Sequence, residues 1–136
     1  MVIKELKTLP KEKHGRFIEN TKIEKHEKRT CKYLLKFGFN IETIKPVNIS
    51  GTNNPDILIS GAIWEIKSPF SYNEQTLKNR MKKASKQASR VIFDLRNIKN
   101  GYDKAEYSLI KLFYGNTRIR RMIIIKKNGK TLDFRK

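Results

Sequence analysis

Three ionisable side chains in one short stretch have the types and spacing of a hydrolytic metal centre. Eight residues separate Asp56 from Glu65, and a single residue separates Glu65 from Lys67. Two carboxylates that come close together repel each other unless a positive charge lies between them. Oxygen ligands are those that hard divalent cations prefer. The pattern therefore predicts a bound divalent cation with a lysine close to it.

A β-hairpin is expected to position these three residues. Two short apolar runs in residues 57–67 flank a serine-glycine pair, which is typical of a tight hairpin turn. Alternation along the second strand then puts Glu65 and Lys67 on the same face. Asp56, next to the first strand, can face them from the other leg of the hairpin.

The string Pro55-Asp56, eight residues, Glu65-Ile66-Lys67 resembles the active-site signature of the PD-(D/E)XK nuclease superfamily. This superfamily includes restriction endonucleases, Holliday-junction resolvases and several bacterial toxins. The resemblance implies that Asp56 and Glu65 bind Mg2+ or Mn2+ together with the backbone carbonyl of Ile66, and that Lys67 acts on the attacking water. An ordinary surface hairpin with an exposed salt bridge is the alternative interpretation.

A first helix is predicted over residues 22–37, because Thr21-x-x-Glu24 has the form of a capping box and Gly38 favours a helix end. At helical spacing Glu27 falls within the apolar stripe. Many nucleases of the superfamily carry a glutamate on the first core helix that faces the metal. The resemblance thus implies that Glu27 completes the catalytic and metal-binding site, and a salt bridge to a lysine at the edge of the core is the alternative.

A second helix is predicted over residues 72–89, opened by a capping box at Ser71. Arg80, Lys83 and Gln87 follow one edge of its apolar stripe, from which they can reach the end of the hairpin strand. Arg80 and Lys83 are candidates to hold phosphates of a substrate. Gln87 resembles a glutamine that recurs after the E-x-K strand in parts of the superfamily, which implies a catalytic role; a solvated glutamine is the alternative.

The remaining pattern predicts an α/β fold in one nuclease domain over residues 21–136, preceded by a basic arm over residues 1–20 with at most a short helix. The order helix, three strands, helix, strand is the αβββαβ core that the PD-(D/E)XK resemblance implies, a mixed central sheet flanked by helices with an added C-terminal β-hairpin. The further predicted elements are a strand over 39–49 interrupted near Pro46, a strand over 91–95, a helix over 103–114, and strands over 121–126 and 131–135 around Asn128-Gly129.

The charge of the chain indicates a polyanionic partner. The 136 residues include 31 Lys and Arg against 13 Asp and Glu, a formal net charge of +18 that is spread along the sequence. Arg118, Arg120 and Arg121 form a cluster predicted to bind nucleic acid. A single cysteine excludes an intramolecular disulfide, and no apolar run is long enough to predict membrane insertion. A non-catalytic RNA-binding protein would be equally basic and stays an alternative.

A narrower resemblance covers about residues 20–126. The run Ile63 to Pro69, a helix ending in Lys86-Gln87-Ala88 and a strand ending in Asp94-Leu95 are similar to C-terminal tRNA-nuclease domains of contact-dependent growth inhibition proteins of the CdiA type. This resemblance implies a tRNA-cleaving toxin, neutralised by an acidic immunity protein. It also implies action in the cytoplasm, with delivery as part of a larger secreted protein. A DNA endonuclease of resolvase or restriction type would share the same motifs and is the first alternative.

Overall fold

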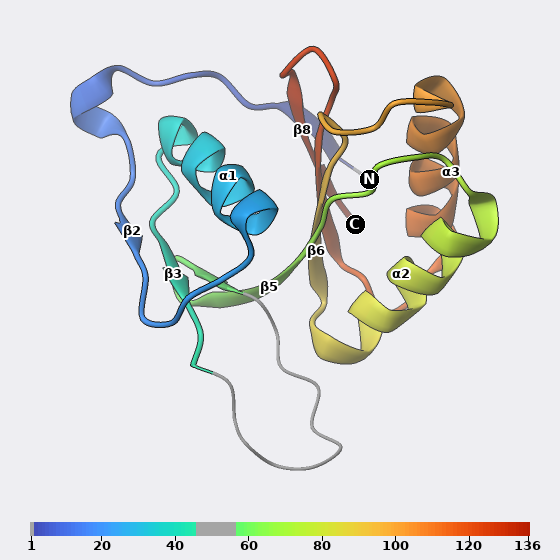
Figure 1. The fold of residues 1–136 in the computed structure, drawn as a ribbon, viewed down its shortest axis with the longest axis horizontal. Coiled ribbons are helices and arrows are strands. Elements are labelled where there is room, and N and C mark those ends of the chain that lie inside the picture. The colour runs from blue at the N-terminus through green and yellow to red at the C-terminus, as the bar shows by residue number, and fades with distance from the viewer. Residues whose placement is uncertain (1, 46–56) are drawn as a thin grey trace.

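A twisted mixed β-sheet forms the centre of the computed structural model, which describes residues 2–45 and 57–136 (Figure 1). Within these residues the sheet has eight strands in the order β1-β8-β7-β6-β5-β4-β3-β2. The strands are β1 (Val2–Glu5), β2 (Phe17–Ile18), β3 (Ile41–Thr43), β4 (Ile57–Ile59), β5 (Ala62–Lys67), β6 (Arg90–Asp94), β7 (Arg121–Ile125) and β8 (Thr131–Arg135). The helices are α1 (Lys25–Leu34), α2 (Glu74–Gln87) and α3 (Tyr102–Gly115), with the 3-10 turns η1 (Lys11–Lys13) and η2 (Leu35–Phe37).

Helices cover the sheet from both sides, with α1 on one face and α2 and α3 on the other (Figure 1). Alternation along the strands divides the core accordingly. Trp64 and Ile66 of β5 pack with Cys31 and Leu34 of α1, in a cluster that extends to β6 and β7. The opposite cluster joins apolar side chains of α2 and α3 to the other face of β6, β7 and β8. The central strands β5, β6 and β7 are parallel, as expected for strands that are buried on both faces.

The predicted order of helix, three strands, helix, strand, helix and two strands is confirmed from α1 to β8. The C-terminal hairpin is not an appendage, because β7 pairs in parallel with β6 and thereby extends the central sheet. Of the strand predicted over residues 39–49, the structure describes β3 alone as a strand, and residues 46–49 lie outside the described part. No helix among the described residues is long and apolar enough to cross a membrane.

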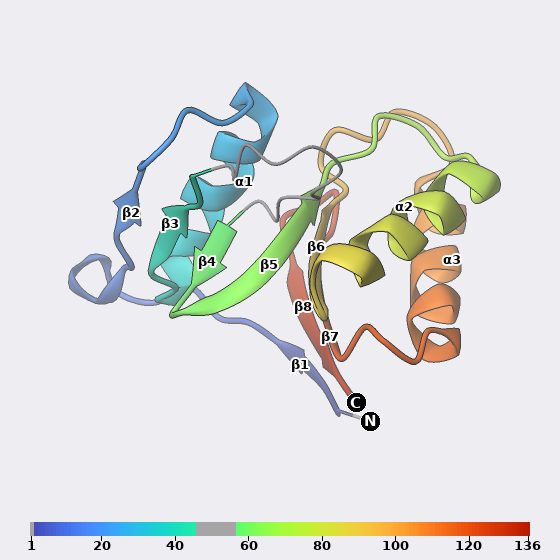
Figure 2. The ribbon, with the colours of Figure 1, turned by 90° about the horizontal axis from the view of Figure 1, so that it is seen from below.

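The N-terminal segment departs from the expectation of an arm with at most a short helix. Besides η1 it supplies both edge strands: β1 pairs antiparallel with β8, and β2 pairs in parallel with β3 (Figure 2). That expectation of its structure is therefore wrong. Both strands are short, and Val2, Ile3 and Ile18 are more than half exposed. The segment therefore has little of the alternation between buried apolar and exposed polar residues by which a strand is recognised in a sequence. Its strand structure comes from pairing with distant partners.

Both predicted capping boxes are also wrong in position. Thr21 does not cap α1, because the helix begins only at Lys25; the Thr21 backbone N–H donates instead to Thr43 Oγ1 at 2.9 Å and ties Thr21 to β3. Glu24 takes the cap position instead, and its backbone N–H donates to Glu27 Oε1 at 3.3 Å. At the start of α2 the cap is Asn73, whose side-chain oxygen accepts a hydrogen bond from the N–H of Thr76 at 2.9 Å.

Candidate active site

The predicted hairpin is present and places β5 beside the parallel core. Ser60 and Gly61 both have positive φ angles, 48° and 84°, which is the geometry of a two-residue turn that matches the twist of the flanking strands. β5 pairs with β4 as far as Trp64 and then continues against β6, where Glu65 is opposite Val91. Asp56, the first residue of the predicted triad, lies outside the described residues.

Glu65 and Lys67 form a salt bridge that is largely buried. Lys67 Nζ is 3.2 Å from Glu65 Oε1, and the side chains are 18% and 3% exposed. Both project from the face of β5 opposite to Trp64 and Ile66, as the predicted alternation requires. The alternative of an exposed surface salt bridge is therefore wrong for this pair. A carboxylate taken out of water in this way needs partners that compensate its lost hydration.

Gln87 supplies the second partner of Glu65. With the amide oriented so that its nitrogen faces the carboxylate, an assignment made from the hydrogen-bonding pattern, Gln87 donates to Oε2 at 2.7 Å and to Oε1 at 2.9 Å. The last residue of α2 thus contacts a strand residue 22 positions earlier in the sequence. The structure brings Glu65, Lys67 and Gln87 together and excludes the alternative of a solvated glutamine.

The edge of α2 that carries Gln87 also carries Arg80 and Lys83. The spacings of three and four residues put the three side chains on one line along the helix. Arg80 is half-buried and Lys83 is exposed, and neither makes an ion pair within the part of the chain that the structure describes. Their positive charge lies along the same helix edge as Gln87, and their predicted contact with phosphates stays a prediction.

Glu27 belongs to α1, the helix that covers the Trp64 and Ile66 face of β5. It belongs to the first turn of α1, where its carboxylate accepts the backbone N–H of Glu24. One turn later, Cys31 packs in the cluster of Trp64 and Ile66, on the face opposite to the Glu65 side chain. Capping is a role that neither the metal-site hypothesis nor the lysine-pair alternative anticipated. The predicted contribution of Glu27 to catalysis and metal binding stays a prediction.

The predicted arginine cluster divides into two parts. Arg118 and Arg120 are exposed in the segment that leads into β7. Arg121 instead donates to both carboxylate oxygens of buried Asp133, at 3.0 and 2.8 Å, and its guanidinium lies 5.1 Å from the centre of the Trp64 ring. Arg121 therefore has a structural contact as well, and Arg118 and Arg120 are the more exposed members of the cluster. The predicted contact of all three with nucleic acid stays a prediction.

Sequence reasoning missed a second buried acid, at the end of β6. Asp94 is 1% exposed, and it accepts a hydrogen bond from Thr30 Oγ1 at 2.6 Å and paired hydrogen bonds from the Arg96 guanidinium at 3.0 and 2.8 Å. Burial raises the pKa of Asp94, but the hydrogen bonds from Arg96 and Thr30 outweigh it and hold the pKa below its ordinary value. The sequence signal that could have identified this buried acid is Asp94 inside the apolar run of residues 91–95, with Arg96 two residues later.

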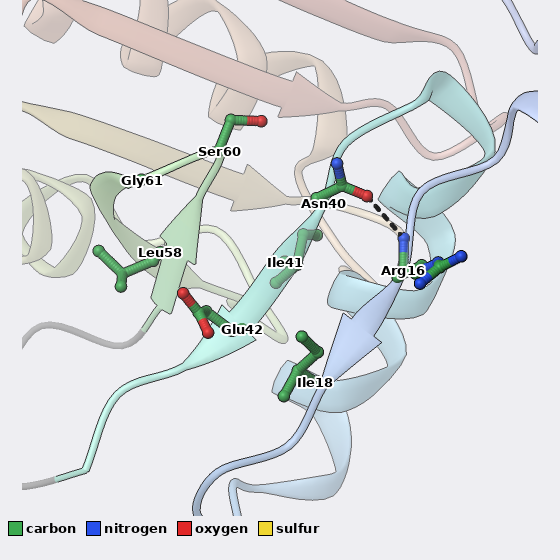
Figure 3. Close-up of a pocket in the computed structure, with 8 residues that line it drawn as sticks. All are labelled: Arg16, Ile18, Asn40, Ile41, Glu42, Leu58, Ser60 and Gly61. Atoms are coloured by element: carbon green, nitrogen blue, oxygen red, sulfur yellow. Dashed lines mark hydrogen bonds between the residues drawn. The ribbon is translucent and has the colours of Figure 1, made fainter.

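The described residues contain no group of three or more His, Cys, Asp or Glu side chains placed to hold a metal ion, and Asp56 is not among them. Figure 3 shows a separate hollow of about 360 Å³ at the β2–β4 end of the sheet. Its wall includes Ile18, Glu42 and Leu58, and Asn40 Oδ1 accepts the backbone N–H of Arg16 at 2.9 Å beside it. Glu65, Lys67 and Gln87 are not part of this hollow.

Comparison with known proteins gives one family and one solved structure. The sequence model described as the contact-dependent growth inhibition CdiA C-terminal domain matches residues 53–131, which include Asp56, Glu65, Lys67 and Gln87. Among curated proteins no sequence matches this chain. A CdiA-CT/CdiI toxin and immunity complex from Burkholderia pseudomallei contains a chain of similar fold, with a TM-score of 0.67 at 19% identity, covering 90% of this chain and 100% of that one.

Proposed function

Since the chain belongs to the family of the contact-dependent growth inhibition CdiA C-terminal domain, we propose that it is a toxin domain that hydrolyses phosphodiester bonds of RNA, with tRNA as the first substrate. The observation that carries this proposal is the buried carboxylate of Glu65, which has Lys67 on one side and Gln87 on the other. Buried Asp94 and Asp133 are likewise held by more than one donor, and Glu65 differs from them in belonging to the Glu65-Ile66-Lys67 motif. A carboxylate held rigidly by two donors is typical of a preorganised catalytic site.

The donor chemistry of this site fits a divalent cation. Glu65 offers carboxylate oxygens in a fixed position, and oxygen ligands suit Mg2+ or Mn2+. Asp56, Glu65 and the Ile66 carbonyl are the proposed ligands, with Glu27 as a proposed further contributor. When bound, the cation would supply a Lewis acid that stabilises negative charge on the scissile phosphate.

Lys67 has the position of the residue that handles the attacking water. Its side chain is 18% exposed, so a lysine that is mostly packed still has surface that can meet a water molecule or a phosphate oxygen. Glu65 fixes the orientation of Lys67 through the 3.2 Å contact. Gln87 fixes the Glu65 carboxylate in turn, so that the proposed ligand oxygens and the lysine keep a constant relative position.

Charge and family support RNA and an immunity partner. The net charge of +18 favours a polyanionic substrate, and Arg80, Lys83, Arg118 and Arg120 are proposed to hold its phosphates. The related solved structure is a toxin bound to an immunity protein, so an acidic immunity protein is proposed as the partner of this chain. Delivery as part of a larger secreted protein agrees with the same family relationship, and action in the cytoplasm of a target cell is proposed with it.

Cleavage assays on defined nucleic acids test this proposal. With Mg2+ or Mn2+ the wild-type protein is expected to cut tRNA, and EDTA is expected to stop the reaction. Asp56→Ala, Glu65→Gln and Lys67→Ala should each lower the cleavage rate by at least about a hundredfold, which corresponds to roughly 2.7 kcal/mol of barrier. Circular dichroism and melting curves establish that each variant remains folded.

Glu74→Gln provides the matched control, because Glu74 is an exposed glutamate at the start of α2 and its loss should leave the rate unchanged. Full activity in a folded Glu65→Gln or Lys67→Ala variant would remove the catalytic assignment. If the protein cut duplex DNA and left tRNA intact, the proposed function would change to a DNA endonuclease of resolvase or restriction type. Tight RNA binding without cutting under any metal would identify a non-catalytic RNA-binding protein.

A further inference from the structure

Phe70 is the exposed phenylalanine of this chain. All seven phenylalanines lie in the described part, and the other six are buried or half-buried, whereas Phe70 is 57% exposed. Unlike tyrosine, a phenylalanine ring has no polar group that water can bind. Its exposure leaves apolar surface in contact with water, at a cost that a bound ligand would remove.

The loop that carries Phe70 is held firmly in place. Ser68 and Pro69 are buried, and the Ser68 hydroxyl accepts a hydrogen bond from Asn97 Nδ2 at 3.2 Å. The Phe70 carbonyl accepts the backbone N–H of Lys99 at 2.9 Å, and a second backbone bond joins residues 72 and 100 at 3.1 Å. The ring is thus presented by an anchored loop and loses little conformational freedom when a ligand covers it.

A histidine contacts the ring, and basic residues lie near the loop that carries it. The His26 ring meets Phe70 in a T-shaped contact, with centroids 6.3 Å apart and planes at 68°. Lys99 is exposed next to the loop, and Arg29 is exposed on α1, where its guanidinium donates to Asn97 Oδ1 at 2.5 Å. A protein-binding hot spot is usually a packed apolar cluster. A single exposed aromatic ring with basic residues nearby is instead typical of a site that stacks a nucleobase between contacts to phosphates.

Phe70 lies close in sequence to the end of β5, the strand that carries Glu65 and Lys67. It follows Lys67 by three residues, so the two Cα atoms are at most about 11 Å apart. We propose that Phe70, supported by His26, is a stacking subsite for an unpaired base of the RNA strand that is cut. Its place beside the scissile phosphate rests on the proposed function, whereas the stacking itself does not. Such a subsite would make the enzyme prefer unpaired segments over duplex.

Binding measured in EDTA tests the subsite independently of cleavage. The probes are a short single-stranded RNA that carries 2-aminopurine, and a duplex of the same sequence. Phe70→Ala is expected to weaken binding of the single strand about tenfold and to leave duplex binding nearly unchanged. Phe70→Tyr should restore tight binding. The 2-aminopurine fluorescence should be quenched by the wild type and by Phe70→Tyr, and not by Phe70→Ala.

Tyr107→Ala is the matched control, because Tyr107 is an aromatic residue of α3 that is 67% exposed, and this variant should bind as the wild type does. Unchanged single-strand binding and quenching in Phe70→Ala would overturn the subsite while cleavage by the wild type still supported the proposed function. If the wild-type protein quenched the 2-aminopurine fluorescence but cut no RNA, the subsite would be supported and the proposed function would be wrong. Loss of immunity-protein binding alone in Phe70→Ala would assign the ring to a protein interface and overturn the subsite.

Discussion

Glu65 has two partners that reach it by different routes. Lys67 is two residues away on the same strand, so any β conformation brings the two side chains to one face. Gln87 reaches the same carboxylate only because α2 packs back against β5. The pair Glu65–Lys67 is therefore a local feature, whereas the three-residue arrangement depends on the position of a helix.

Gln87→Ala should lower the cleavage rate about tenfold, because a hydrogen bond to a charged group contributes roughly 1.5–3 kcal/mol and its loss leaves the Glu65 carboxylate less well fixed. Single-turnover cleavage with Mg2+ measures the effect. Gln75→Ala is the control, since Gln75 belongs to the same helix and bonds only to Asn79 among the described hydrogen bonds. Equal rates for the two variants would show that Gln87 does not support catalysis.

Among the secondary-structure elements, α1 and β6 are joined by a buried polar contact as well as by apolar packing. Thr30 of α1 donates to Asp94 at the end of β6, and Arg96 binds the same carboxylate while lying 4.0 Å from the centre of the Tyr33 ring. Tyr33 in turn donates to the carbonyl of Gly129 in the β7–β8 turn. This network fixes the position of α1 relative to the sheet. It therefore also fixes the packing of α1 against Trp64 and Ile66 of β5.

Asp94→Asn should lower the free energy of unfolding by about 2–4 kcal/mol at neutral pH, since it leaves Arg96 without its buried partner. The lowered pKa of Asp94 stabilises the folded protein above the pKa of an unfolded aspartate, and this contribution is lost as the pH falls through the folded-state pKa. The variant should therefore lose less stability on acidification. Urea denaturation at several pH values, with exposed Asp103→Asn as control, measures both effects; a parallel pH dependence in wild type and Asp94→Asn would contradict the assignment.

For the molecule as a whole, positive charge is widespread but only part of it is available to a substrate. Arg121 and Arg135 both bind Asp133, at 2.8 and 3.0 Å, so these two charges help to hold β7 and β8 together. Arg118 and Arg120 are exposed near the start of β7. Salt dependence separates these roles, because only a cation that contacts a phosphate displaces counterions when RNA binds.

The double variant Arg118→Ala/Arg120→Ala should reduce the slope of log K against log salt concentration by about 1.4 for single-stranded RNA. Lys11→Ala/Lys13→Ala removes the same charge from η1, which Figure 1 shows far from β7, and should change the slope less. Titrations at several salt concentrations measure both slopes. Equal changes in the two variants would mean that the two arginines contribute only to net charge.

Local patterns in the sequence determined much of this protein. The serine-glycine turn, the alternation of β5, the order of elements from α1 to β8 and the nearness of Glu65 to Lys67 all follow from interactions within a few residues. Such features can be predicted from the sequence, because turn residues and the spacing of apolar side chains determine structure over a few residues. Helical spacing predicted that Gln87 could reach the end of the hairpin strand, and a resemblance added its catalytic role; the contact with Glu65 agrees with the predicted placement.

Only the tertiary structure decided the features that join distant segments. The N-terminal residues became edge strands because β8 and β3 offered unpaired backbone groups, which no periodicity in those residues could indicate. Arg121 looked like its neighbours in sequence, and Asp133 gave it a different role. The surroundings of Asp94 and Phe70 also come from distant segments, because α1 contacts both residues and the loop after β6 holds the Phe70 backbone. Burial and pairing between distant residues depend on the packed chain, so the sequence alone does not reveal them.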